Sequence, residues 1–254
     1  MNRNWFGTSV VICVVALLTY GCATELPIER PFSLGGHGEH SKIVCCLLIP
    51  DGNNLLTNGS LEDDPTNPRF HPNVSGGVMS LPFGSTTIPG WTVVGVTVSG
   101  GNPQEIAWGG NNNQFVPNGA TDGNFFVDLT GVFDRQSADG FFAGVQQTFT
   151  TVPNQFFDYE LSFDIMVANF QRPIEVIAEI RNNPNDEKPY ESKTCEIVAS
   201  DPPTQTCTKF FKAQSTSTTL TIKATKGNGY VGLDKVFVEC LTPFGFPGFL
   251  DLCH

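Results

Sequence analysis

The segment at 104–115, QEIAWGGNNNQF, joins one aromatic ring to a run of amide side chains. An indole ring can stack on the apolar face of a sugar ring, and amides can hydrogen-bond to the sugar hydroxyls. We expect this segment to be a loop that presents these groups to a ligand. The candidate ligand-binding residues are Trp108, Asn111, Asn113 and Gln114.

Patterns typical of enzymes are not found in the sequence. There is no G-x-S-x-G elbow, H-E-x-x-H zinc helix, P-loop or dinucleotide fingerprint. His37 and His40 stand three apart in a Gly-rich stretch, which is more typical of a solvated leader than of a metal site. The acidic pair Asp63 and Asp64 could in principle hydrolyse a glycoside, but acids in turns usually cap or meet solvent. We therefore expect a non-catalytic protein.

Composition narrows the class of partner. The chain has 254 residues, of which 15% are charged, and a formal net charge of −11. Such an acidic chain does not release counterions from nucleic acid, so nucleic-acid binding is not expected. The charge also disfavours polyanionic, pectin-like glycans. The 26 Gly and 18 Pro residues are typical of many short strands joined by turns.

The N-terminus resembles an export signal. Arg3 precedes a short apolar run at 10–18, and small residues follow at 21–23. We expect residues 1–23 to be a signal peptide cleaved after Ala23, which makes the protein secreted, extracellular or cell-surface. The alternative is a lipoprotein anchored through Cys22. No later apolar run has the length of a membrane span, so we expect no transmembrane segment in the mature chain.

Six cysteines remain after such cleavage: Cys45, Cys46, Cys195, Cys207, Cys240 and Cys253. An even number in an exported chain favours disulfides, and vicinal or widely spaced cysteines do not match a zinc site. Cys195 and Cys207 flank the Pro-Pro turn of ASDPPTQT, and each lies in a strand-like run. We expect a bridge across that hairpin and leave the other pairings open.

Period-2 alternation of apolar and polar residues recurs along the chain and predicts strands. The clearest case is DYELSFDIMVANF at 158–170. We expect roughly nine or ten strands, no helix, and an all-β, two-sheet jelly-roll sandwich. The expected organisation is a leader at 24–50, the sandwich at 51–241 and a tail at 242–254. We expect the stretch 63–87, which lacks a strand pattern, to be an elaborated loop.

Six segments resemble a known family in their order along the chain. They are NNLLTNGSLE, IPGWTVVG, DGNFFVDLTG, GVQQTFTTVPNQ with YELSFD, STSTTLTIKA and GYVGLDKVFV. The order of these segments is similar to the order of motifs in secreted galactose-binding-like domains, including the plant cell-wall domain of unknown function 642 and bacterial choice-of-anchor proteins. The resemblance covers about residues 52–240 and implies a jelly-roll fold with a carbohydrate-binding ancestry. The chain ends in FGFPGFLDLCH, without the sorting tail of many bacterial members.

The resemblance also implies a metal and one further ligand contact. Related carbohydrate-binding jelly rolls often hold a structural Ca²⁺ with acids at positions that match Glu62 and Asp234. Carboxylates are suitable calcium ligands, but the same residues could instead satisfy turn and strand backbone donors. Tyr230 is similar to a family position before the last strand and is a candidate for ligand binding.

Two functions are therefore expected. The first is an exported, non-catalytic carbohydrate-binding or cell-wall-associated module with a polysaccharide or glycan as partner. The alternative is a structural or adhesive extracellular protein that binds protein partners and has no sugar site. The sequence does not indicate which glycan is bound or the oligomeric state.

Overall fold

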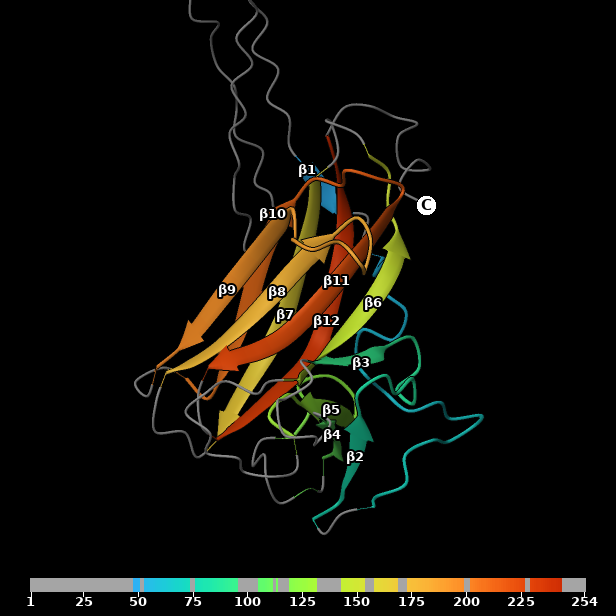
Figure 1. Cartoon of the computed structure of the whole chain (residues 1–254), viewed down its shortest axis with the longest axis vertical. Coiled ribbons are helices and arrows are strands. Elements are labelled where there is room, and N and C mark those ends of the chain that lie inside the picture. The colour runs from blue at the N-terminus through green and yellow to red at the C-terminus, as the bar shows by residue number, and fades with distance from the viewer. Residues whose placement is uncertain are drawn as a thin grey trace, which may run out of the picture.

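Two antiparallel sheets form the molecule, with the five-stranded sheet in front of the seven-stranded sheet in Figure 1. The computed structural model describes residues 48–50, 53–73, 76–95, 105–111, 113, 119–131, 143–153, 158–168, 173–198, 202–226 and 229–243. These residues contain twelve strands and no helix. The predicted all-β, two-sheet jelly-roll sandwich is confirmed, with two or three more strands than expected.

The seven-stranded sheet has the order β10-β7-β12-β5-β4-β2, and β1 pairs with β12 outside this path. Its long central strands, β7 and β12, pair along most of their length, and β7 lies where the alternation at 158–170 predicts a strand. The strands are β1 (Leu48–Pro50), β2 (Val78–Pro82), β4 (Glu105–Gly110), β5 (Phe125–Asp128), β7 (Asp158–Ala168), β10 (Thr204–Phe211) and β12 (Tyr230–Pro243).

The five-stranded sheet has the order β3-β6-β11-β8-β9, so β3 and β9 are its edges. β8 alternates strictly between buried apolar and half-exposed side chains, whereas β6 and β11 contain runs of consecutive buried residues. The strands are β3 (Thr92–Gly95), β6 (Ala143–Thr150), β8 (Ile174–Arg181), β9 (Glu191–Ile197) and β11 (Ser217–Lys226).

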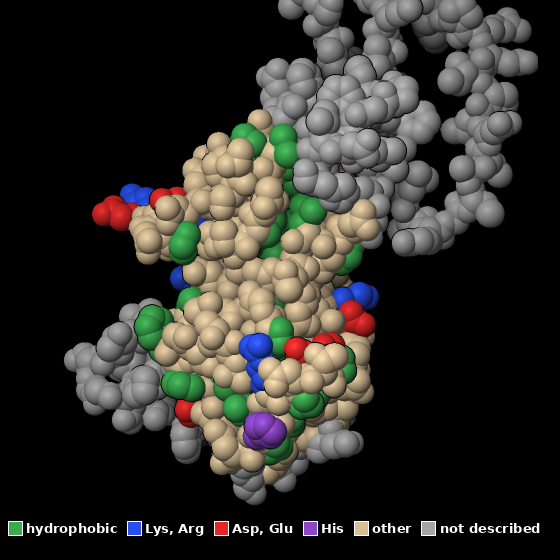
Figure 2. Space-filling view, turned by 90° about the vertical axis from the view of Figure 1, so that its right-hand side faces the viewer, with side chains coloured by type: hydrophobic (Ala, Val, Ile, Leu, Met, Phe, Trp, Pro, Cys, Tyr) green, Lys and Arg blue, Asp and Glu red, His purple; other side chains and the backbone are tan. Residues whose placement is uncertain are grey.

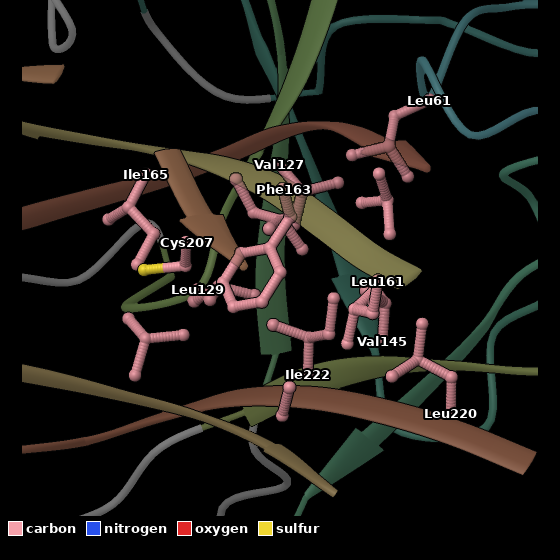
Figure 3. Packing of buried hydrophobic residues seen from close by; sticks show 14 of the residues in the cluster. Leu61, Val127, Leu129, Val145, Leu161, Phe163, Ile165, Cys207, Leu220 and Ile222 are labelled. Atoms are coloured by element: carbon pink, nitrogen blue, oxygen red, sulfur yellow. The ribbon is translucent and has the colours of Figure 1, made fainter. Parts of the chain in front are cut away.

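The core lies between the sheets. In Figure 3, Leu161 and Phe163 of β7 lie between the sheets with Val145 of β6 and Ile222 of β11. All four side chains are fully buried. Burial of each such side chain contributes roughly 1.5–3 kcal/mol, so the inward half of every alternating strand holds the two layers together. Its outward half is left free for polar residues.

Two segments that we expected to be loops are strands. Residues 78–82 of the expected 63–87 loop form β2, and the segment around Trp108 forms β4, which pairs with β2 and β5. Neither segment alternates cleanly: β4 is buried on both faces over its four middle residues. A two-sided burial pattern cannot be distinguished from other apolar runs by periodicity, which explains the error at β4, whereas β2 is short and shows no regular alternation.

The disulfide between Cys195 and Cys207 joins the two sheets. Cys195 lies on β9 of the five-stranded sheet and Cys207 on β10 of the seven-stranded sheet, with their Cα atoms 6.4 Å apart. The expected pairing is present, but the expected hairpin is not, because the chain crosses from one sheet to the other at the Pro-Pro turn. Lys209 Nζ lies 2.7 Å from Glu191 Oε2 and adds an ion pair between the same two strands. Cys240 is also disulfide-bonded.

Within the described part of the chain, no helix has the length and apolar character needed to cross a membrane.

Candidate functional site

Both predicted metal ligands hold the backbone of one short segment, residues 119–125. Glu62 Oε1 accepts hydrogen bonds from the N–H groups of Asn124 (2.7 Å) and Phe125 (2.8 Å). Asp234 Oδ2 accepts from the N–H groups of Thr121 (2.7 Å) and Asp122 (2.8 Å). We call this arrangement the carboxylate clasp. It joins the start of the domain and its last strand to the same segment.

A break in the last strand aims Asp234 at the clasp. The pairing of β12 with β7 shifts register between Asp234 and Phe237, and Lys235 there has a φ of 51°. A bulge of this kind redirects a side chain that regular alternation would place elsewhere. Asp234 is 0% exposed, and this burial raises its pKa to about 6, against the lowering effect of its backbone hydrogen bonds.

The carboxylate oxygens of the clasp accept hydrogen bonds from amide N–H groups in this structure. Calcium takes six to eight oxygen ligands, whereas the oxygens of Asp234 and one oxygen of Glu62 already accept amide hydrogens. The positive ends of those N–H groups would repel a cation. Among the described residues, no group of three or more His, Cys, Asp and Glu side chains could hold a metal. Calcium binding stays a prediction from the resemblance.

Three other predicted ligand-binding residues, Asn111, Asn113 and Tyr230, have structural contacts close to the clasp. Asn111 donates to the carbonyl oxygen of Gly123 (3.1 Å) and accepts from the N–H of Ala120 (2.5 Å). Asn113 is buried and donates to the carbonyl oxygen of Gly110. Tyr230 is half-buried against a small apolar cluster on the seven-stranded sheet. Gln114 lies outside the described residues.

Trp108 is a core residue, contrary to the expected exposed loop position. Its side chain is 0% exposed, and its indole N–H donates to the carbonyl oxygen of Leu61 at 2.9 Å. Its ring packs against Phe70 and Phe125, with centroids 5.3 Å and 5.4 Å away. A ring enclosed in this way offers no face to a sugar. Because Leu61 directly precedes Glu62 in the chain, the hydrogen bond from Trp108 to Leu61 helps to hold Glu62 of the clasp in position.

A different set of polar residues crosses the outer face of the five-stranded sheet. The strand registers place one residue of each strand in a single line from edge to edge. Their inward neighbours on β3, β6, β8 and β11, such as Val93, Val145 and Ala178, are buried in the core. Ser192 on β9 pairs directly with Glu179, so the five side chains point outward on one face. We call them the polar row: Ser192, Glu179, Thr221, Gln146 and Thr92.

Glu179 anchors the row through two ion pairs. Its Oε2 lies 2.8 Å from Arg181 Nη1, and its Oε1 lies 3.0 Å from Lys223 Nζ. The side chains of Glu179 and Arg181 are 13% exposed, and that of Lys223 is 32% exposed. Burial raises the pKa of Glu179, but the hydrogen bonds from Arg181 and Lys223 outweigh burial and the pKa is lowered overall. The carboxylate is therefore ionised and held in one orientation.

The rest of the row is also ordered by side-chain contacts. Gln146 donates from its amide to the hydroxyl of Thr221 at 2.8 Å. The next outward pair, Thr148 and Thr219, is joined by a 2.9 Å contact between hydroxyls. These bonds leave other donors and acceptors of the half-exposed Gln146 directed outward. Thr221 and Thr219 are themselves buried, so the groups that the row can offer to a polar ligand are the amide of Gln146 and the hydroxyls of Thr92 and Ser192.

The sequence contained a signal for this face. The outward positions of β8 read Glu-x-Ile-x-Glu-x-Arg from 175 to 181, and those of β11 read Thr-x-Thr-x-Lys from 219 to 223. Gln146 and Gln147 are neighbours on one strand and therefore lie on opposite faces, and Gln146 is the outward one. The registers that align Glu179, Thr221 and Gln146 depend on pairing between distant strands, which alternation alone does not specify.

Neutral surface dominates the side of the molecule that carries β6, β3 and β2. Figure 2 shows few charged side chains there among neutral polar atoms and scattered hydrophobic ones. This distribution agrees with the 15% of charged residues in the chain. A surface of this kind suits a ligand rich in hydroxyl groups better than a highly charged one.

No protein-family model and no curated protein matches the chain. Among solved structures, TmCBM61 in complex with β-1,4-galactotriose is similar over 74% of this chain and 98% of that chain, with 12% identity and a TM-score of 0.42. The CBM22-1 xylan-binding domain of Xyn10C from Paenibacillus barcinonensis covers 66% and 96%, with 16% identity and a TM-score of 0.39. Arabinose-bound MgGH51 α-L-arabinofuranosidase covers 74% of this chain and 26% of that chain, with 8% identity and a TM-score of 0.45.

Proposed function

We propose that this protein is an exported, non-catalytic module that binds a polysaccharide along the polar row. The observation that carries the proposal is the line of five polar side chains that crosses the whole five-stranded sheet, in which all but the buried Thr221 reach the outer surface at least in part. Export is inferred from the signal-like N-terminus and the interstrand disulfide. Both ends of the row lie on edge strands, so a long chain can continue past either side.

Pre-organisation favours this role. The carboxylate of Glu179 is fixed by Arg181 and Lys223, and the amide of Gln146 is fixed by Thr221. A ligand that replaces water on such groups does not have to order them first, so less side-chain entropy is lost on binding. Hydroxyl groups of a sugar can both donate and accept, which matches a surface of mixed donors and acceptors.

The charges of the face favour a neutral polysaccharide. Arg181 and Lys223 both bind Glu179, while Glu175 and Glu196 add carboxylates at directly opposed outward positions of β8 and β9. No excess positive charge therefore remains on these strands to attract a polyanion. Binding to a neutral polymer should change little between low and high salt, because screening acts on charged partners.

A pull-down of the purified protein on a panel of neutral and acidic insoluble polysaccharides tests the proposal. We expect retention on a neutral polymer, and loss of retention in the double variant Thr92→Ala with Gln146→Ala. Both side chains are only half-buried, so the variant should keep its melting temperature. A folded protein that binds no polymer on the panel would overturn the proposal and favour a protein-binding, adhesive role.

A further inference from the structure

Phe83 carries the most exposed large hydrophobic side chain in the described part of the chain. Its side chain is 57% exposed. Exposed aromatic surface without a polar group is costly in water, and such rings often mark a contact site. We therefore expect a ligand or partner to cover the ring of Phe83.

The ring is carried on a rigid turn. The N–H of Ser85 donates to the carbonyl oxygen of Pro82 at 3.0 Å, and Gly84 has a φ of 80°. These features describe a type II turn with Phe83 at its first central position. Arg69 Nη1 also donates to the carbonyl oxygen of Thr86 at 3.4 Å and braces the following residues. The exposed position of Phe83 is therefore fixed by the hydrogen bonds and backbone conformation of the turn.

The same turn is hydrogen-bonded to the edge of the five-stranded sheet. The N–H of Gly84 donates to the carbonyl oxygen of Val93, and the N–H of Val93 donates to the carbonyl oxygen of Ser85, both at 2.9 Å. Val93 follows Thr92, the last member of the polar row. Phe83 is therefore held beside the β3 end of the row.

The surface next to the ring is open. A Cβ atom built on Gly84 would have no neighbouring atom within 4 Å. A flat ligand can therefore approach this part of the turn without displacing protein atoms. The polar row itself contains no aromatic residue, so it can bind hydroxyl groups but lacks a surface for the apolar face of a sugar ring.

We propose that Phe83 is the stacking platform of the site, on which one sugar ring of the polysaccharide lies while its neighbours bind the polar row. This inference deepens the proposed function and rests on it. Stacking of an apolar sugar face on the ring removes exposed aromatic surface from water and supplies the contact that the polar row lacks.

The test is the affinity of Phe83→Ala for the polysaccharide that the wild-type protein retains, measured by isothermal titration with soluble oligosaccharides of that polymer. We expect about a fivefold loss of affinity, the scale of one aromatic contact. Phe83→Trp should restore or increase binding, because the indole presents a larger ring. Phe210→Ala is the matched control, since Phe210 is 47% exposed but lies on β10 of the other sheet.

The outcomes separate this inference from the proposed function. Unchanged affinity in Phe83→Ala, with wild-type binding intact, would overturn the role of Phe83 and leave polysaccharide binding standing. Equal losses in Phe83→Ala and Phe210→Ala would also overturn it, because they indicate a general effect of removing surface rings. Absence of wild-type binding to every polymer would instead remove the proposed function on which this inference rests.

Discussion

The carboxylate clasp and the polar row use the same kinds of side chain for different purposes. In the clasp, the carboxylates of Glu62 and Asp234 accept hydrogen bonds from backbone N–H groups. In the row, Gln146 and Glu179 bond to neighbouring side chains and stay on the outer face of a sheet. A polar residue that satisfies buried backbone groups is structural, whereas one that is ordered by its neighbours yet reaches solvent remains available to a ligand.

The largest loss of stability is expected from substitution of Trp108, which packs beneath the segment that carries Glu62 of the clasp. Trp108→Ala removes a fully buried indole and the hydrogen bond to Leu61, so we expect the free energy of unfolding to fall by about 3–5 kcal/mol. Chemical denaturation measures the change. Wild-type stability in this variant, with lost sugar binding, would contradict the core position and return Trp108 to the ligand site.

Asp234→Ala should have the next largest effect. The substitution leaves the N–H groups of Thr121, Asp122 and Lys235 without their acceptor. We expect a loss of about 3 kcal/mol in unfolding free energy, measured by denaturation, and unchanged affinity of the folded fraction for polysaccharide. A selective loss of affinity at full stability would show that the clasp is itself a binding site.

Gln146 and Gln147 provide a matched pair on one strand. The buried amide of Gln147 accepts from the N–H of Thr57 (2.6 Å) and donates to its carbonyl oxygen (2.8 Å). Gln147→Ala should therefore lower the unfolding free energy by roughly 1–3 kcal/mol. Gln146→Ala should change stability by less than about 0.5 kcal/mol and weaken polysaccharide binding several-fold. Thermal melts and titrations of both variants would contradict the comparison if the two effects were exchanged.

Two buried aspartates predict a dependence of stability on pH. Burial raises the pKa of Asp128 and of Asp234 from 3.8 to about 6, despite hydrogen bonds that lower it. The folded protein then binds these protons more readily than the unfolded chain. Their contribution to stability is complete below about pH 3.8 and is lost as the pH rises through 6.

We therefore expect the melting temperature to rise as the pH is lowered from 7 to 4.5. The rise should be smaller in Asp128→Asn, which has lost one of the two titrating groups. Calorimetry of the two proteins over this range measures the difference. Identical pH profiles would show that Asp128 does not contribute, and a falling wild-type melting temperature on acidification would reverse the sign derived from both groups.

The smallest expected effect is that of metal removal. Because amide N–H groups already bind Asp234 and Glu62, chelator should shift the melting temperature by no more than about 1 °C, less than a stability change of 1 kcal/mol produces. Scanning calorimetry with and without added Ca²⁺ is the measurement. A clear calcium-dependent rise would restore the metal site that the family resemblance implies.

The sequence by itself determined the fold class and most of the strands. Alternation in segments such as 158–165 and 174–181 is enough to predict strands, and it correctly placed the inward side chains of β7 and β8, although the second half of β7 is buried on both faces. The pairing of Cys195 with Cys207 was also predicted from their spacing. These features are local, so periodicity and short sequence distances report them.

Only the tertiary structure decided which polar residues form a site. Asp234 meets Thr121 across 113 residues of sequence, and Gln146 meets Thr221 across 75. The role of each side chain depends on long-range strand registers and on a bulge in β12, and no local pattern encodes those pairings. The run of amides beside Trp108 resembled a binding loop, yet burial placed that ring in the core, because two-sided packing and ligand contact both favour an aromatic residue.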